Sequence, residues 1–232
     1  KMTPQAVLGW ILNRLHLGID YPWSRIHFSA KSKVDGSMRS LQGRGDVPGA
    51  GERLIGKLSA PDALLLHAID HILSQTIDPQ FSKHSYAYRR NGQTQRHALE
   101  KFRSLKWGGA GFTFAAKLDI RDFFGSIPHE PLLAALAAPT IPEDVTNLIT
   151  GFLKATSESA PAGVAGRGLL QGSPISGVLA NAYLDPVDRY LERQGITFIR
   201  YADDITLLAN SGEALESAIT QTQEQLTLLG LT

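Results

Sequence analysis

Two adjacent aspartates between two short apolar runs place the tightest constraint on how this chain folds. Residues 197–201 and 205–209 are apolar runs of strand length, and they flank Ala202, Asp203 and Asp204. This pattern predicts a strand-turn-strand hairpin with both carboxylates at the turn. Like charges side by side disfavour joint ionisation, so the pair is costly unless a cation binds to it. Because Asp is common in hairpin turns, the pair alone still favours a plain turn.

A third carboxylate stands at the end of an earlier apolar run. Residues 112–120 combine aromatic and aliphatic side chains, as a buried strand would, and Asp119 lies at the end of that run. Nucleotidyl transfer uses two divalent cations roughly 3.5–4 Å apart, one to activate a hydroxyl and one to stabilise the leaving pyrophosphate. Magnesium suits ligation by oxygen atoms alone. Asp119, Asp203 and Asp204 are therefore candidate ligands for two Mg²⁺ ions, with Mn²⁺ as a substitute.

Composition limits the classes of protein that need to be considered. The chain has 232 residues, 43% of them hydrophobic and 19% charged, which is enough for one domain or two intimate subdomains. The net charge is only +1, so a nucleic-acid surface has to come from local clusters of basic residues. The absence of cysteine excludes disulfides and thiolate zinc sites. No apolar run approaches the roughly 20 residues needed to span a bilayer, and we expect a soluble cytoplasmic protein without a membrane partner.

Segments with helical spacing of apolar residues are interspersed with short strands and loops. Predicted helices cover residues 6–17, 60–73, 93–105, 128–136, 142–153, 174–191 and 213–229. Residues 29–56 are rich in Gly, Ser, Lys and Arg, which predicts a mobile, basic loop or hairpin system. Helices and strands without strict alternation favour an α+β fold.

Three motifs, taken in order, resemble those of a known enzyme family. They read DIRDFF from Asp119, QGSP from Gln171 and RYADD from Arg200. In this order they resemble the reverse transcriptases, in particular the bacterial branch of group II intron, retron and CRISPR-associated enzymes. The resemblance runs from about residue 32 to residue 231 and changes the balance against a plain turn.

The resemblance implies roles for the residues of the first and last motifs. Its metal ligands correspond to Asp119, the backbone carbonyl of Ile120, Asp203 and, less directly, Asp204. Phe124 falls at the family's steric gate, where a bulky ring would meet a ribose 2′-hydroxyl and so favour deoxynucleotides. Core packing is the alternative for Phe124, and it is our expectation for its neighbour Phe123.

The resemblance also implies contacts with the nucleotide and the nucleic acid. Gln171 and Gly172 match the motif that lies against the incoming nucleotide and the template base. The sequence SYAYRRNG from Ser85 resembles the fingers motif written SYGFRPGRS, although Asn91 stands where the family often has glycine. The residues expected to contact template or primer are Tyr86, Arg89, Arg90, Tyr201 and Ala202. Asn181 and Tyr183 resemble family positions that we expect to be structural.

The basic residues that hold the triphosphate have two alternative placements. Lys33-x-Asp35-Gly36-x-x-Arg39 matches the spacing of the family, whereas Arg53 lies where a second alignment would put the arginine. Both arginines cannot occupy one pocket, and the extra residues 42–52 separate the two alternatives. We favour Lys33 and Arg39, and a solvated loop is the third alternative.

The implied architecture is a right-hand polymerase whose palm has an antiparallel sheet packed on helices. Residues 1–110 are expected to be fingers, 111–127 palm, 128–165 a return to the fingers, and 166–232 palm. The lysine-bearing palm segment, primer grip and thumb that follow in the family are absent from this sequence. We therefore expect one module of a longer protein, with fused or associated domains that carry the thumb, of CRISPR-associated or intron type.

The implied function is RNA-directed DNA polymerisation, in which dNTPs are added to a primer on an RNA or DNA template. Two alternatives stay open. An RNA-dependent RNA polymerase also has an Asp-Asp turn, but Phe124 argues against it. A turnover-deficient RNA-binding or scaffolding module is the non-enzymatic alternative, and the complete set of carboxylates argues against it.

Overall fold

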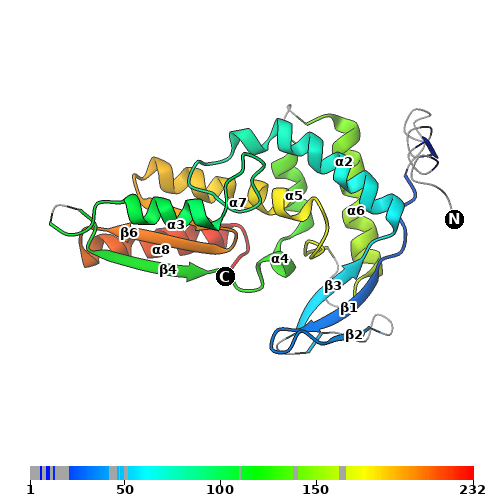
Figure 1. Ribbon diagram of the computed structural model, residues 1–232, viewed down its shortest axis with the longest axis horizontal. Coiled ribbons are helices and arrows are strands. Elements are labelled where there is room, and N and C mark those ends of the chain that lie inside the picture. The colour runs from blue at the N-terminus through cyan, green and yellow to red at the C-terminus, as the bar shows by residue number, and fades with distance from the viewer. Residues whose placement is uncertain are drawn as a thin grey trace. The chain divides into compact units, whose positions relative to one another are not determined.

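The chain forms two compact units, each built from two stretches of sequence. The first unit comprises residues 1–72 and 128–176, and the second comprises residues 73–127 and 177–232. Each unit has its own three-stranded antiparallel sheet (Figure 1). The computed structural model describes residues 6, 9, 10, 13, 21–41, 46, 48, 49, 52–109, 111–137, 141–161 and 166–232.

The sheet of the first unit has the strand order β2-β1-β3. Its strands are β1 (His27–Ser32), β2 (Met38–Ser40) and β3 (Glu52–Lys57). On β1, Ala30 pairs with Arg39 of β2, and the next residue, Lys31, pairs with Arg53 of β3. Because successive side chains point to opposite faces of a sheet, Arg39 and Arg53 project from opposite faces. Of the two alternatives for residues 29–56, the hairpin system is therefore confirmed.

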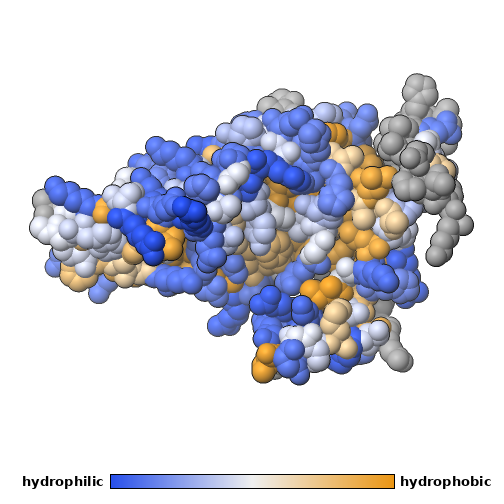
Figure 2. All heavy atoms as spheres, in the orientation of Figure 1, coloured by the Kyte–Doolittle hydropathy of each residue, from blue (hydrophilic) through white to orange (hydrophobic). Residues whose placement is uncertain are grey.

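Apolar residues reach the surface at the turn between β1 and β2. Val34 and Met38 are 95% and 60% exposed there. On the face drawn in Figure 2 hydrophilic residues predominate, and hydrophobic surface appears as separate patches, one of them at this end of the sheet.

Helices supply the rest of the first unit. They are α2 (Ala60–Thr76), whose last residues belong to the second unit, α5 (His129–Leu136) and α6 (Glu143–Ser159). Asp62 in the first turn of α2 is 1% exposed and accepts hydrogen bonds from the Tyr21 hydroxyl at 3.0 Å and the Ser24 amide at 3.3 Å. The Trp23 and Phe152 rings lie 5.1 Å apart, which anchors the chain before β1 on α6. These polar and aromatic contacts therefore hold residues 21–24 against α2 and α6.

The sheet of the second unit has the strand order β4-β6-β5. Its strands are β4 (Phe114–Asp119), β5 (Thr197–Tyr201) and β6 (Asp204–Ala209). The expected hairpin is confirmed, since β5 and β6 pair directly. The expectation that the run ending at Asp119 is a buried strand is wrong, because β4 is an edge strand whose residues alternate between exposed and half-buried over most of its length. Its run contains Ala, Lys and Asp, which leave one face open to solvent.

Helices pack against parts of both faces of this second sheet. They are α3 (Gln95–Ser104), α4 (Phe123–Ser126), α7 (Ser176–Arg193) and α8 (Gly212–Leu228), with a short 3₁₀ helix η1 (Asp78–Gln80). Ile199 packs with Ala98 and Phe102 of α3, while the next residue, Arg200, contacts Asp188 of α7. Successive side chains of a strand point to opposite faces, so α3 and α7 lie on opposite sides of β5.

Most predicted helices are confirmed to within a few residues, the exceptions being the first helix and the C-terminal end of α6. Most of residues 6–17 and of the extra residues 42–52, and part of the Gly-rich stretch 162–172, lie outside the described residues. Helix α6 continues six residues beyond its predicted end at residue 153. The boundaries between the two units fall after residues 72, 127 and 176, and differ from the expected division into fingers and palm. The assignment of the units to fingers and palm stays a prediction.

Across the part of the chain that the structure describes, every helix is too short or too polar to cross a membrane.

Candidate functional site

The turn between β5 and β6 carries the two adjacent aspartates. Tyr201 pairs with Asp204, so the loop of the hairpin is only Ala202 and Asp203. On the other side of β6, Asp204 pairs with Asp119 at the end of β4. Three carboxylates from two distant stretches of sequence therefore lie at neighbouring positions at one end of the sheet.

The backbone of this turn adopts a conformation that side chains disfavour. Ala202 has a φ of 58°, in the left-handed region that two-residue hairpin loops normally fill with glycine. A non-glycine residue there costs about 1–3 kcal/mol and persists only when the surrounding structure holds it. The turn is therefore held in place by contacts outside the hairpin ladder.

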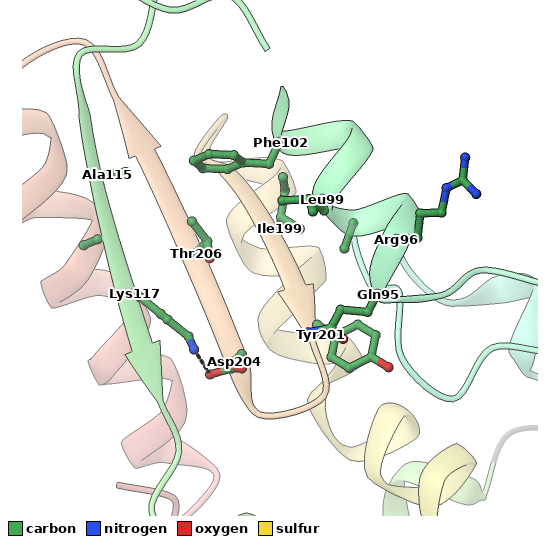
Figure 3. A pocket seen from close by; sticks show the side chains of 12 residues that line it. Gln95, Arg96, Leu99, Phe102, Ala115, Lys117, Ile199, Tyr201, Asp204 and Thr206 are labelled. Carbon is green, nitrogen blue, oxygen red and sulfur yellow. Dashed lines mark ion pairs between the residues drawn. The ribbon is translucent and has the colours of Figure 1, made fainter. Parts of the chain in front are cut away.

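Electrostatics at the turn reflect the crowding of negative charge. Burial raises the pKa of Asp203, and the neighbouring carboxylates of Asp119 and Asp204 raise it further. Lys117, on β4, places its Nζ 2.8 Å from Oδ1 of Asp204 (Figure 3), and this hydrogen bond raises the pKa of the lysine. The side chains of this ion pair are 64% and 39% exposed, so the pair contributes little to stability and can open.

The carboxylates fit a hard divalent cation by their chemistry. Asp119 and Asp203 provide oxygen donors, which are the ligands that magnesium takes. Within the described residues, no three or more His, Cys, Asp or Glu side chains converge closely enough to hold a metal ion. The carboxylate of Asp204 is bound to Lys117 in this structure. The donor set therefore fits the ion by its chemistry, while the third carboxylate is paired with a lysine.

A groove of about 720 Å³ lies beside the carboxylates. Figure 3 shows it between α3 and the open face of the sheet, with the ion pair of Lys117 and Asp204 at one end and Phe102 farther along. Tyr201 lies on its wall and is half-buried. The groove thus joins the candidate metal ligands to an extended, partly apolar surface.

Phe124 and Phe123 have different surroundings. Phe123 is 2% exposed, which confirms the expectation that it belongs to the core, while Phe124 is half-buried. The ring of Tyr88 meets that of Phe124 edge to face, with centroids 5.9 Å apart and an interplanar angle of 89°. Sequence reasoning placed Phe124 as a candidate but missed Tyr88, although the residue stands within the SYAYRRNG motif.

Helix α7 leaves room for the Tyr88 ring at Gly177. A Cβ atom at Gly177 would lie 2.6 Å from Cγ of Tyr88, so only glycine leaves room for the ring. Tyr88 itself has a φ of 56° and is 51% exposed. Burial raises the pKa of its hydroxyl, and the charge of Asp203 raises it further. The Tyr88 side chain therefore packs on the candidate gate and lies within the field of the candidate metal turn.

Two residues expected to contact template or primer lie inside the second unit. Arg89 has a side chain only 4% exposed, with its Nε 2.6 Å from Asp78 and further hydrogen bonds to the carbonyls of Asp78, Ser82 and Ser85. Tyr86 is 7% exposed and packs in a cluster with Ile199. The structure thus corrects the expectation for both side chains, because a desolvated, fully engaged arginine and a core tyrosine cannot grip nucleic acid. Arg90 is exposed, and its backbone amide donates to Asp78.

The positions expected to be structural are confirmed as such. Asn181 is 1% exposed and its Nδ2 donates to the Ala87 carbonyl at 2.8 Å. The Tyr183 hydroxyl donates to the carbonyl of Leu229 at 2.5 Å, which ties α7 to the end of α8. Ala202 is 6% exposed, so little of this residue is open to a primer.

The nucleotide-binding candidates of the QGSP motif belong to the first unit. Gly172 has a φ of 91°, a conformation that requires glycine. Gln171 pairs with Ile55 of β3 through the backbone, and Cβ at Gly56 would meet Leu170 at 2.1 Å. The motif is therefore fixed against β3, two residues from Arg53.

The triphosphate candidates differ in what already binds them. Arg39 donates to Asp46 at 2.7 Å and to Glu52 at 3.0 and 3.1 Å. Lys33 is exposed in the turn after β1, and Arg53 is exposed on the opposite face of the sheet from Arg39. Because carboxylates already bind Arg39, we take Arg53 forward in place of the Arg39 that we preferred from the sequence, and both assignments stay predictions.

Comparison with known proteins gives a consistent result. A family model described as "Reverse transcriptase (RNA-dependent DNA polymerase)" matches residues 48–232. The retron Mx65 reverse transcriptase of Myxococcus xanthus is 34% identical over 138 residues, which cover 53% of this chain and 32% of that protein. An uncharacterized 91 kDa protein in the cob intron of Schizosaccharomyces pombe is 30% identical over 150 residues, which cover 63% of this chain and 18% of that protein.

A solved structure titled "Partial Cas6-RT-Cas1--Cas2 complex" also matches, with a TM-score of 0.40 and 20% identity, covering 98% of this chain and 38% of the other. The chain spans about a third or less of the length of the two curated relatives just named.

Proposed function

The chain belongs to the reverse transcriptase family, and we propose that it forms the catalytic part of an RNA-directed DNA polymerase. The observation that carries the proposal is the register of β4 and β6, which brings Asp119 opposite Asp204 and beside Asp203. Carboxylates gathered in this way are costly for a fold, as the raised pKa of Asp203 indicates, and a bound cation removes that cost.

In this proposal Asp119 and Asp203 are the main metal ligands, joined by the carbonyl of Ile120 and by Asp204. When bound, two Mg²⁺ ions would lower the pKa of the primer 3′-hydroxyl and neutralise the leaving pyrophosphate, and Mn²⁺ could replace them. Lys117 would hold the carboxylate of Asp204 in an ion pair until the site is loaded. Its ion pair is exposed, so the release of Asp204 costs little.

The reaction that this site would carry is a single displacement. The primer 3′-oxygen forms a bond to the α-phosphorus of the dNTP, the bond between the α- and β-phosphates breaks, pyrophosphate leaves, and the hydroxyl proton passes to water. Positioning and electrostatic stabilisation supply most of the rate in phosphoryl transfer of this kind.

Sugar selection in the proposal depends on the aromatic pair of Phe124 and Tyr88. Phe124 would exclude a ribose 2′-hydroxyl by its bulk, and the edge-to-face contact with Tyr88 would support the Phe124 ring. Gln171 and Gly172 would lie against the nucleotide, and Arg53 with Lys33 would bind its triphosphate. Arg90, Tyr201 and the backbone of Ala202 would face template or primer.

We assign the second unit, which carries the carboxylates, to the palm and the first unit to the fingers. Association with further domains, in a CRISPR-associated or intron-type protein, is part of the proposal. The similarity to the retron enzyme of Myxococcus xanthus supports this reading, in which the chain belongs to the bacterial branch of the family.

Primer extension tests the proposal. Asp203→Ala should leave the fold intact, as judged by circular dichroism, and abolish magnesium-dependent addition of a single dNTP to an annealed primer. Extension by the folded Asp203→Ala chain would end the assignment. An unaltered chain that binds nucleic acid and adds no nucleotide would instead favour a binding or scaffolding module.

A further inference from the structure

The residue before the YADD sequence is an arginine buried in the middle of the second unit. Arg200 is 1% exposed and has the largest of the fully buried side chains. Its Nε and Nη2 donate to the carboxylate of Asp188 at 2.6–3.1 Å, and Asp188 is 0% exposed. Because a buried ion pair of this kind is often no more stabilising than a pair of apolar side chains, stability alone does not explain why it is there.

The remaining contacts of the guanidinium lead to the metal-binding turn. Nη1 of Arg200 donates to the carbonyl of Ala202 at 3.0 Å. That carbonyl belongs to the peptide bond between Ala202 and Asp203. Ala202 is the residue with the strained φ of 58°. A charge-assisted hydrogen bond to this carbonyl fixes the plane of the peptide and, with it, the direction in which the Asp203 side chain leaves the turn.

The same guanidinium also leads toward Tyr88. Nη1 donates to Oδ1 of Asn181 at 3.0 Å, and Nδ2 of Asn181 donates to the carbonyl of Ala87 at 2.8 Å, one residue before Tyr88. The Arg200 backbone strengthens the link, since its amide donates to His84 and its carbonyl accepts from Tyr86. Asn181 and Asp188 lie two helical turns apart on one face of α7, so a single helix face supplies both partners of the arginine.

We propose that Arg200 is a positioning residue that holds the metal-binding turn through Ala202 and the sugar-selecting Tyr88 through Asn181, so that one buried cluster sets both. The inference rests on the proposed function. A lysine could not replace the arginine, because only the planar fork of a guanidinium reaches a carboxylate, an amide and a carbonyl together. Metal affinity and sugar selection should accordingly respond to changes in this cluster, although Arg200 contacts neither substrate nor metal.

The test removes the cluster without leaving a buried charge. The double variant Arg200→Met, Asp188→Leu replaces the ion pair with apolar side chains of similar size, an exchange that other folds tolerate. Mn²⁺ binding is then followed by electron paramagnetic resonance of the free ion, and circular dichroism with a thermal melt verifies folding. Loss of an outer partner of a metal site typically weakens metal binding by about 10–100-fold, and we expect a loss of that size together with a weaker preference for dNTP over rNTP.

A second variant separates the two arms of the cluster. Asn181→Ala keeps the bond from Arg200 to Ala202 but removes the link to Ala87, so it should weaken the preference for dNTP and leave Mn²⁺ affinity unchanged. Thr222→Val is the matched control, because Thr222 is equally buried in this unit and donates to Ala218 of its own helix, so neither readout should change.

The outcomes distinguish this inference from the proposed function. A folded double variant with the Mn²⁺ affinity of the unaltered chain overturns the role of Arg200 at the turn. Unchanged nucleotide preference in Asn181→Ala overturns the link to Tyr88. If the unaltered chain binds no Mn²⁺, or if Asp203→Asn binds it equally well, the proposed function fails and the inference fails with it.

Discussion

A methyl group added at Gly177 should loosen the selection of deoxynucleotides. The Cβ of Gly177→Ala would lie 2.6–2.7 Å from three atoms of Tyr88, closer than carbon atoms pack, so the ring has to move. Helix α7 itself should not suffer, because alanine is favoured over glycine in a helix by about 1 kcal/mol. The substitution therefore displaces Tyr88 from Phe124 without removing either aromatic side chain.

The size of the effect follows from the contact that is lost. An edge-to-face aromatic pair contributes about 0.5–1.5 kcal/mol beyond the area it buries. If that energy keeps Phe124 in its gating position, its loss raises the population of displaced rings by about 2- to 13-fold, since 1.36 kcal/mol corresponds to a factor of ten. The rate of ribonucleotide incorporation relative to deoxynucleotide should rise by up to the same factor.

Single-turnover incorporation of one dNTP or one rNTP into an annealed primer measures this ratio. Tyr88→Ala should give a change of the same sign and similar size. Gly212→Ala is the control, because the added Cβ at the start of α8 has its nearest neighbour at 4.0 Å. A ratio in Gly177→Ala and Tyr88→Ala that matches the control would refute the support that we assign to Tyr88.

Three further predictions follow from the charged residues. Asp203→Asn should raise the melting temperature in chelator at neutral pH. The folded-state pKa of Asp203 is raised, so ionisation of this carboxyl costs stability above that pKa, and the gain should disappear below the unfolded pKa of Asp. An equal gain at acidic pH would contradict this. Arg89→Met leaves the buried charge of Asp78 unpaired and should cost about 3–5 kcal/mol in a denaturant titration, whereas an unchanged midpoint would mean that the pair is not formed. Arg53→Ala should raise the KM for dNTP about tenfold or more, as expected for a lost charge-assisted hydrogen bond, and Arg39→Ala should not; the reverse order would restore Arg39 as the triphosphate ligand.

Local patterns were sufficient to predict the elements that carry the carboxylates. The two apolar runs around Ala202 predict a hairpin because alternation and run length are properties of a few consecutive residues. The position of Asp119 at the end of β4 follows in the same way. Their meeting on one sheet edge came from the family resemblance, since residues 119 and 204 are paired across 85 positions of sequence that no local pattern connects.

The misreadings concern side chains whose partners are distant or hidden. Arginines beside aromatic residues suggested a grip on nucleic acid, but Arg89 is buried by Asp78, a partner that no periodicity announces. Arg200 was interpreted only as part of a motif, because a charged residue in a strand does not indicate that a carboxylate of a distant helix, here Asp188, will pair with it. Tyr88 was missed because its position depends on a glycine, Gly177, that lies 89 residues away.

The two arginine alternatives in the first unit show a different limit. Spacing along the sequence cannot tell which face of a sheet a residue occupies, since a shift of one residue reverses every side chain. The register of β1 with β2 and β3 places Arg39 and Arg53 on opposite faces, and it also exposes the acidic partners of Arg39.

Metal ions bound by carboxylates from two strands are central to the proposed function, and Mn²⁺ titration of the unaltered chain and of Asp119→Asn tests this most directly. Glu216→Gln, an exposed carboxylate on α8, serves as the control. We expect the unaltered chain and the control to bind Mn²⁺ equally, and Asp119→Asn to bind it at least about 10- to 100-fold more weakly, the loss seen for outer partners of metal sites. Equal binding by the folded Asp119→Asn chain would contradict the account, because β4 would then contribute nothing to the site.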